Sequence, residues 1–120
     1  VEHIAMQMAM EYEQLQGRNP SDVSADNVGY DIRSMATDGS KRYIEVKGRS
    51  GTDGVMLSEN EMNRLAQLGD RAWLYIVTDC AAKPQLHLIC NPAQTMNFER
   101  KTKGVQFFLP LAEWQAHETM

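Results

Sequence analysis

The sequence has little cysteine, no long hydrophobic run and no overall excess of positive charge. Its two cysteines, Cys80 and Cys90, lack the Cys-x-x-Cys spacing of a structural zinc site. In the cytoplasm, the expected compartment, such a pair stays reduced and fills apolar space. No stretch approaches the roughly 20 apolar residues of a membrane span, and no basic-then-apolar start marks a secretion signal. We therefore expect neither a zinc site nor a membrane partner.

The formal net charge of −4 argues against a stand-alone nucleic-acid-binding protein, because affinity for phosphates comes from cations. The local distribution of charge differs from this total. Four basic residues lie within residues 41–49. We expect three of them to contact nucleic acid: Lys41, Arg42 and Arg49. A second basic cluster over residues 100–103 is interpreted either as a further contact or as solvated surface charge.

The chain of 120 residues is long enough for one domain with a buried core, and its 42% hydrophobic and 23% charged residues are typical of globular proteins. It opens in an amphipathic pattern without an initiator methionine. We therefore expect residues 1–120 to be a single domain, excised from the C-terminal part of a larger, helicase-like protein.

Periodicity predicts an α/β fold with the element order α-β-β-β-α-β-β. Helices are expected over residues 1–16, 58–69 and from 110 onward, and strands over 29–35, 41–47, 55–57, 72–78, 85–90 and 105–109, with a polar loop over 21–27. The first helix is predicted to pack on the sheet through an apolar stripe of Ile4, Ala5, Met8, Tyr12 and Leu15. The second helix begins with a capping box, in which Ser58 and Glu61 satisfy free amides.

One motif carries most of the chemical information: Asp31 is followed on the next expected strand by Glu45 and Lys47. Side chains alternate between the faces of a strand, so Glu45 and Lys47 project from the same face. The Asp-Gly pair in the turn over residues 37–40 predicts a hairpin that brings Asp31 opposite Glu45. Two carboxylates beside an amine predict a magnesium site suited to cleaving phosphodiester bonds. The competing interpretation, a structural Glu45–Lys47 ion pair, leaves Asp31 unexplained.

An aspartate followed by Glu-x-Lys on a neighbouring strand resembles the PD-(D/E)XK nuclease superfamily. The runs YEQLQGRNPSDVSADNVGYDIRS, YIEVKGR, LSENE and WLYIVTD resemble one branch of it, the domain named after the plant protein NO VEIN. The likeness spans the first two thirds of the chain and departs from the superfamily at Tyr30, where a proline is usual. It implies a restriction-endonuclease-like core, a mixed sheet flanked by helices, and an association with bacterial helicases and phage-defence proteins.

The resemblance also implies roles for individual residues. Asp31, Glu45 and the backbone carbonyl of Val46 would hold one Mg²⁺ or Mn²⁺, and Lys47 would orient or help to deprotonate the attacking water and stabilise charge on the phosphate. The loop over residues 48–54 would contact the substrate backbone, chiefly through Arg49.

A glutamate on the first helix often approaches the metal in related nucleases. Glu2 and Glu13 lie on the same flank of the expected helix, and Glu13 is the chosen ligand because its surroundings resemble the family; a solvated helix flank is the competing interpretation. Glu61 is explained by capping alone and is left out of the catalytic set.

The favoured function is therefore a metal-dependent nuclease domain acting on DNA, with RNA left open, in the service of a helicase or defence protein. The alternative is a non-catalytic module that keeps the fold and binds nucleic acid or protein through the same basic face. Retention of Asp31, Glu45 and Lys47 favours the enzyme, whereas the acidic net charge favours the module.

Overall fold

The computed structural model describes residues 1–101 and 106–119. Its helices are α1 (Glu2–Leu15), α2 (Glu59–Leu68), α3 (Pro92–Thr95) and α4 (Leu111–Ala116). Its strands are β1 (Asn19–Asp22), β2 (Ile32–Met35), β3 (Lys41–Gly48), β4 (Val55–Ser58), β5 (Ala72–Thr78), β6 (Gln85–Cys90), β7 (Glu99–Lys101) and β8 (Gln106–Leu109). Short 3₁₀ turns cover Ser24–Asp26 and Gly69–Arg71.

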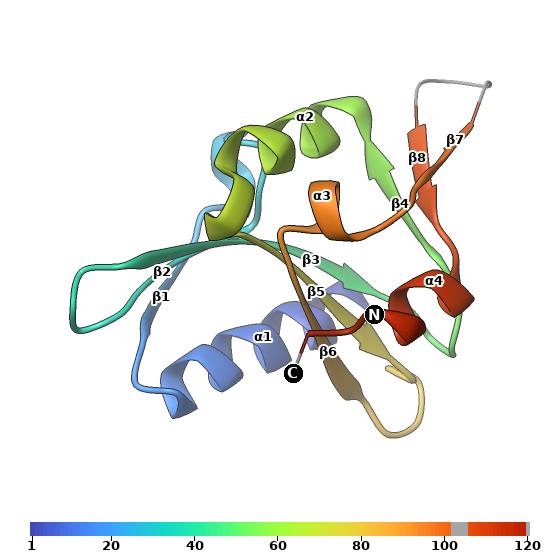
Figure 1. The fold of residues 1–120 in the computed structure, drawn as a ribbon. Coiled ribbons are helices and arrows are strands. Elements are labelled where there is room, and N and C mark those ends of the chain that lie inside the picture. The colour runs from blue at the N-terminus through green and yellow to red at the C-terminus, as the bar shows by residue number, and fades with distance from the viewer. Residues whose placement is uncertain (102–105, 120) are drawn as a thin grey trace.

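The main sheet has five strands in the order β1-β2-β3-β5-β6, and only β3 and β5 run parallel. Helix α1 covers one face of this sheet (Figure 1). The other face carries α2, α3 and α4 together with a second sheet in the order β4-β8-β7 (Figure 1). The predicted α/β class, a mixed sheet flanked by helices, is confirmed.

Strand β5 supplies side chains to the cores on both faces of the sheet. Leu74 and Ile76 pack with Leu65 of α2 and Trp114 of α4, whereas Tyr75 packs on the α1 side. A strand buried on both faces reads as a continuous apolar run, which is why the sequence predicts β5 well.

The apolar stripe predicted for the first helix is partly wrong. Ile4 is 38% and Leu15 84% exposed, whereas Ala5 is fully buried and Met8 and Tyr12 pack against the core as predicted. Ala9 and Glu13 are also buried. Alanine allows the helix to approach closely: a Cβ added to Gly48 of β3 would lie 2.9 Å from the Cβ of Ala5.

Other differences concern short elements. The expected loop over residues 21–27 contains the end of β1, and the sequence analysis did not predict β1, α3 or β7. Strand β2 begins at Ile32 rather than at residue 29, and Pro110 caps α4 instead of lying inside it. Residue 105, the expected start of the last strand, lies outside the described residues. No helix among the described residues is long and apolar enough to cross a membrane.

Candidate active site

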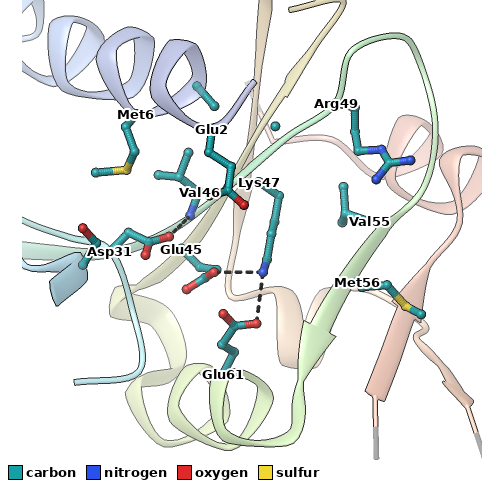
Figure 2. Close-up of a pocket in the computed structure, with 13 residues that line it drawn as sticks. Glu2, Met6, Asp31, Glu45, Val46, Lys47, Arg49, Val55, Met56 and Glu61 are labelled. Carbon is teal, nitrogen blue, oxygen red and sulfur yellow. Dashed lines mark hydrogen bonds and ion pairs between the residues drawn. The ribbon is translucent and has the colours of Figure 1, made fainter. Parts of the chain in front are cut away.

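A hollow of about 340 Å³ lies beside the C-terminal end of β3, between the N-terminal ends of α1 and α2 (Figure 2). Its ionisable side chains are Glu2, Asp31, Glu45, Lys47, Arg49 and Glu61. The structure therefore brings Asp31, Glu45 and Lys47 together in one pocket, which the hairpin register predicts.

Asp31 reaches the hollow because strand pairing stops beside it. Its N–H donates to the carbonyl of Ile44 over 2.9 Å, and its Oδ2 accepts the N–H of Val46 over 2.8 Å. The side chain thus replaces the next backbone partner of β3. The N–H and C=O of one strand residue face the same edge, so the Val46 carbonyl also faces the hollow. Burial raises the pKa of Asp31, although the Val46 N–H and Lys47 oppose this shift.

Glu45 is the most deeply buried carboxyl of the hollow, with 3% of its side chain exposed. Burial, followed by repulsion from Asp31, raises the pKa of Glu45 to about 9. The side chain therefore carries a proton at neutral pH unless additional positive charge is close by.

Lys47 lies between the carboxyl groups of Glu45 and Glu61. Its Nζ is 3.3 Å from Glu45 Oε2 and 3.1 Å from Glu61 Oε1 (Figure 2). Burial alone would lower the pKa of Lys47, but Glu45 and Glu61 outweigh it and the pKa is raised. Lys47 is therefore a charged ammonium, held in place from two sides.

Glu61 belongs to the site, although the sequence analysis left it out. The predicted capping box is present: Glu61 Oε1 accepts the N–H of Ser58 over 2.9 Å, and Ser58 Oγ accepts the N–H of Glu61 over 3.1 Å. The same Oε1 accepts the Lys47 ammonium. Burial favours the neutral acid, but Ser58 and Lys47 outweigh it and lower the pKa of Glu61. The capping box thus fixes a carboxylate that also holds Lys47.

Glu13, the expected metal ligand on the first helix, does not line the hollow. It is fully buried and accepts Arg18 Nε over 2.6 Å, Arg18 Nη2 over 2.9 Å and the Tyr75 hydroxyl over 2.6 Å. Burial alone would raise its pKa, but Arg18 and Tyr75 outweigh it and lower the pKa of Glu13. The glutamate of α1 that lines the hollow is Glu2 (Figure 2), from the turn that packs against Gly48.

Two of the three expected nucleic-acid contacts lie away from the hollow. Arg42 lies on the α1 face of β3, because even-numbered positions there face away from Glu45. Its guanidinium stacks 3.7 Å from the Trp73 ring centroid and donates to the Tyr75 hydroxyl over 3.0 Å. Lys41 is exposed at the start of β3. Arg49 lines the hollow and pairs with Asp53 over 2.9 Å, so the 48–54 loop carries a cation to the rim.

The chemistry of the donors fits a hard divalent cation. Asp31, Glu45 and the Val46 carbonyl provide oxygen atoms, which Mg²⁺ and Mn²⁺ prefer. Burial and the neighbouring Asp31 raise the pKa of Glu45, and a cation bound beside both carboxyl groups would oppose this shift. Within residues 1–101 and 106–119, no three acidic, histidine or cysteine side chains form a ready-made metal cluster. A bound cation would therefore depend on these two carboxylates, the carbonyl and water.

Comparisons with known proteins agree with this geometry. No curated protein matches the chain. The fold is similar to that of Hjc, a Holliday junction resolvase of the archaeon Archaeoglobus fulgidus and a PD-(D/E)XK superfamily member, with a TM-score of 0.64. The alignment has 18% sequence identity and covers 94% of this chain and 93% of Hjc, so the restriction-endonuclease-like fold is shared. Residues 1–89 match the family model described as "Protein NO VEIN, C-terminal". Because this match spans most of the chain, the protein belongs to the family of NO VEIN C-terminal domains.

Proposed function

We propose that this domain is a metal-dependent nuclease that hydrolyses phosphodiester bonds in DNA. The observation that carries the proposal is the convergence of Asp31, Glu45 and Lys47 in one hollow. A protein with the same fold, Hjc, is a Holliday junction resolvase. Three ionisable groups with perturbed pKa values in a concave site are typical of catalysis rather than of structural support.

In the proposed mechanism, Asp31, Glu45 and the Val46 carbonyl would hold one Mg²⁺ or Mn²⁺. When bound, such an ion would activate water and offset the negative charge of the phosphate. Glu45 must lose its proton to serve as a ligand, and positive charge in the hollow favours that loss.

Lys47 contributes charge rather than basicity. Its raised pKa keeps the ammonium protonated, so it cannot take a proton from the attacking water. It instead donates to the developing negative charge on the phosphate. Glu61 holds the ammonium in position, and Arg49 at the rim contacts a neighbouring phosphate.

The proposal extends to partners. DNA is the proposed substrate and RNA a second one to be tested, with a helicase or defence protein supplying further affinity in the cytoplasm. The need for a partner that adds affinity agrees with the net charge of −4, which weakens binding of nucleic acid by the isolated domain.

A non-catalytic binding module is the second candidate function. The contact that favours it is the bond between Asp31 and the Val46 N–H, because it gives the carboxylate a structural task. A structural role for Asp31 together with a Glu45–Lys47 ion pair would leave no need for a metal.

Cleavage assays on variants separate the two functions. Duplex, branched and single-stranded DNA and RNA are incubated with the domain and Mn²⁺ or Mg²⁺. We expect Asp31→Ala and Glu45→Ala to abolish cutting, and Lys47→Ala to lose roughly 100-fold or more in rate while metal binding persists. Lys83→Ala, at an exposed position between β5 and β6, is the matched control for loss of one lysine. Cutting by Asp31→Ala at the wild-type rate would replace the nuclease with the binding module.

A further inference from the structure

A cluster of arginines and tyrosines lies on the α2 side of the main sheet, along the β2–β3 hairpin. Arg33 of β2 is the cross-strand partner of Tyr43 of β3, so both side chains project from the same face. Arg33 Nη2 donates to the Tyr30 hydroxyl over 3.1 Å. The rings of Tyr30 and Tyr43 meet edge to face, with centroids 5.1 Å apart. These contacts hold the Arg33 side chain against the rings of Tyr30 and Tyr43.

Two further arginines lie on the same rings. The guanidinium of Arg71 is 5.5 Å from the Tyr43 centroid, and that of Arg64 is 5.9 Å from the Tyr30 centroid. Stacking on a ring immobilises a guanidinium while leaving N–H groups at its edge free to bind an anion. Lys41 adds a fourth cation, because it is two positions before Tyr43 and faces the same side of β3.

The cations of this cluster have no acidic partners. Within the part of the chain that the structure describes, no carboxylate lies within 4.0 Å of the side-chain nitrogens of Arg33, Lys41, Arg64 or Arg71. The ion-paired cations lie elsewhere and are Arg18, Lys47, Arg49 and Lys101. Acidic residues outnumber basic ones 16 to 12, so four neighbouring cations without a carboxylate are unexpected. Positive charge that carboxylates do not neutralise at short range favours a polyanionic ligand.

The cluster connects directly to the catalytic carboxylates. A second hollow, of about 160 Å³, is lined by Tyr30 of the cluster together with Asp31, Glu45 and Glu61. Along β3, Tyr43 and Glu45 are two residues apart on one face, roughly 7 Å. The β2–β3 hairpin projects beyond α2 (Figure 1).

We propose that Arg33, Lys41, Arg64 and Arg71 bind the sugar-phosphate backbone of a DNA strand that enters the active-site hollow from the β2–β3 hairpin. The proposal rests on the nuclease function and adds the path of its substrate. Tyr30 is only 5% exposed, so this ring supports arginines rather than stacking on bases. Contacts of this kind position DNA without reading its sequence.

The test compares variants of the cluster with a control on another surface. Arg33→Gln/Arg71→Gln removes two cations of the cluster and spares Arg64, whose Nε also donates to the Val28 carbonyl over 3.2 Å. Lys83→Gln removes an exposed cation between β5 and β6 and is the matched control for Lys41→Gln. Binding to a fluorescein-labelled DNA duplex is measured by anisotropy over a range of salt concentrations, in EDTA and in Ca²⁺. Circular dichroism confirms that each variant is folded.

We expect Arg33→Gln/Arg71→Gln to weaken DNA binding about tenfold or more and to reduce the slope of log K against log salt by about two, one for each lost phosphate contact. Lys41→Gln, at an exposed position of β3, should reduce the slope by about one. The Lys83→Gln control should keep the wild-type slope.

Each outcome has a distinct meaning. A wild type that binds no DNA, a cluster variant with the wild-type slope, or a control that loses as much would overturn the proposed path. If the cluster variant loses affinity but the wild type cuts nothing, the DNA path stands and the nuclease function fails. If the wild type cuts DNA but the cluster variant binds it as tightly as the wild type, the nuclease function stands and the path fails.

Discussion

Replacing Glu45 by glutamine is expected to stabilise the metal-free protein. The pKa of Glu45 is about 9 in the folded state and 4.5 for an ordinary glutamate. Between these values the folded state holds a proton that the unfolded state has released, so the free energy of unfolding falls as pH rises. The loss is about 1.4 kcal/mol per pH unit above 4.5, or about 3 kcal/mol near pH 7. Glutamine has the same shape and needs no proton.

Urea unfolding of the wild type and Glu45→Gln, followed by circular dichroism in EDTA, measures this difference. We expect the variant to be more stable by about 3 kcal/mol near pH 7 and the two proteins to converge near pH 4.5. Glu11→Gln, at an exposed position of α1, is the control. A variant less stable than the wild type near pH 7, or a difference that does not depend on pH, would refute the assignment of a neutral, buried Glu45. Mg²⁺ at about 100 times its Kd should reduce the gap, because it stabilises the wild type by about 2.7 kcal/mol.

Three further substitutions test the surroundings of the site. Glu61→Gln keeps the capping box but loses the ion pair to Lys47. We therefore expect kcat to fall roughly 10- to 100-fold with little change in KM or stability. An unchanged kcat would show that Glu61 only caps α2. Ser58→Ala should lower the free energy of unfolding by about 1 kcal/mol and keep most of the activity, measured by urea unfolding and cleavage. Gly29→Ala should destabilise the protein by about 1–3 kcal/mol, because φ is +88° and the new Cβ would lie 2.8 Å from the Cβ of Arg64; wild-type stability would contradict this conformation.

The hairpin and the residues that it brings together in the hollow were predictable from local rules. The Asp-Gly turn fixes the register of β2 on β3, and that register pairs Ile32 with Ile44 and places Asp31 next to Glu45. The capping box at Ser58 likewise fixes where α2 begins. Each of these features depends on a few residues that are close in sequence.

The errors arose where tertiary contacts override local pattern. Hydrophobic periodicity favoured Ile4 and Leu15 of α1, but close packing on the sheet selects the small residues Ala5 and Ala9. Glu2 and Glu13 share a flank of α1 but are 11 positions apart, roughly 16 Å along the helix. The hollow lies at the N-terminal end of α1, so Glu2 lines it and Glu13 does not.

Of two other misplacements, only that of Arg42 had a signal in the sequence. Arg42 and Glu45 are an odd number of positions apart on β3, so strand alternation already puts them on opposite faces. For Glu61, the capping box fixed the carboxylate at the start of α2, but only the packing of α2 over β3 shows that it meets Lys47. That contact joins residues 14 positions apart and has no local signature.

Manganese anomalous diffraction tests the central claim most directly. Crystals of the wild type soaked in Mn²⁺ should show one anomalous peak between the carboxylates of Asp31 and Glu45, adjacent to the Val46 carbonyl. Crystals of Asp31→Ala soaked in the same way should lose the peak, while Lys47→Ala should keep it. The absence of a peak in the wild type, or an equal peak in Asp31→Ala, would contradict a metal-dependent site at the end of β3.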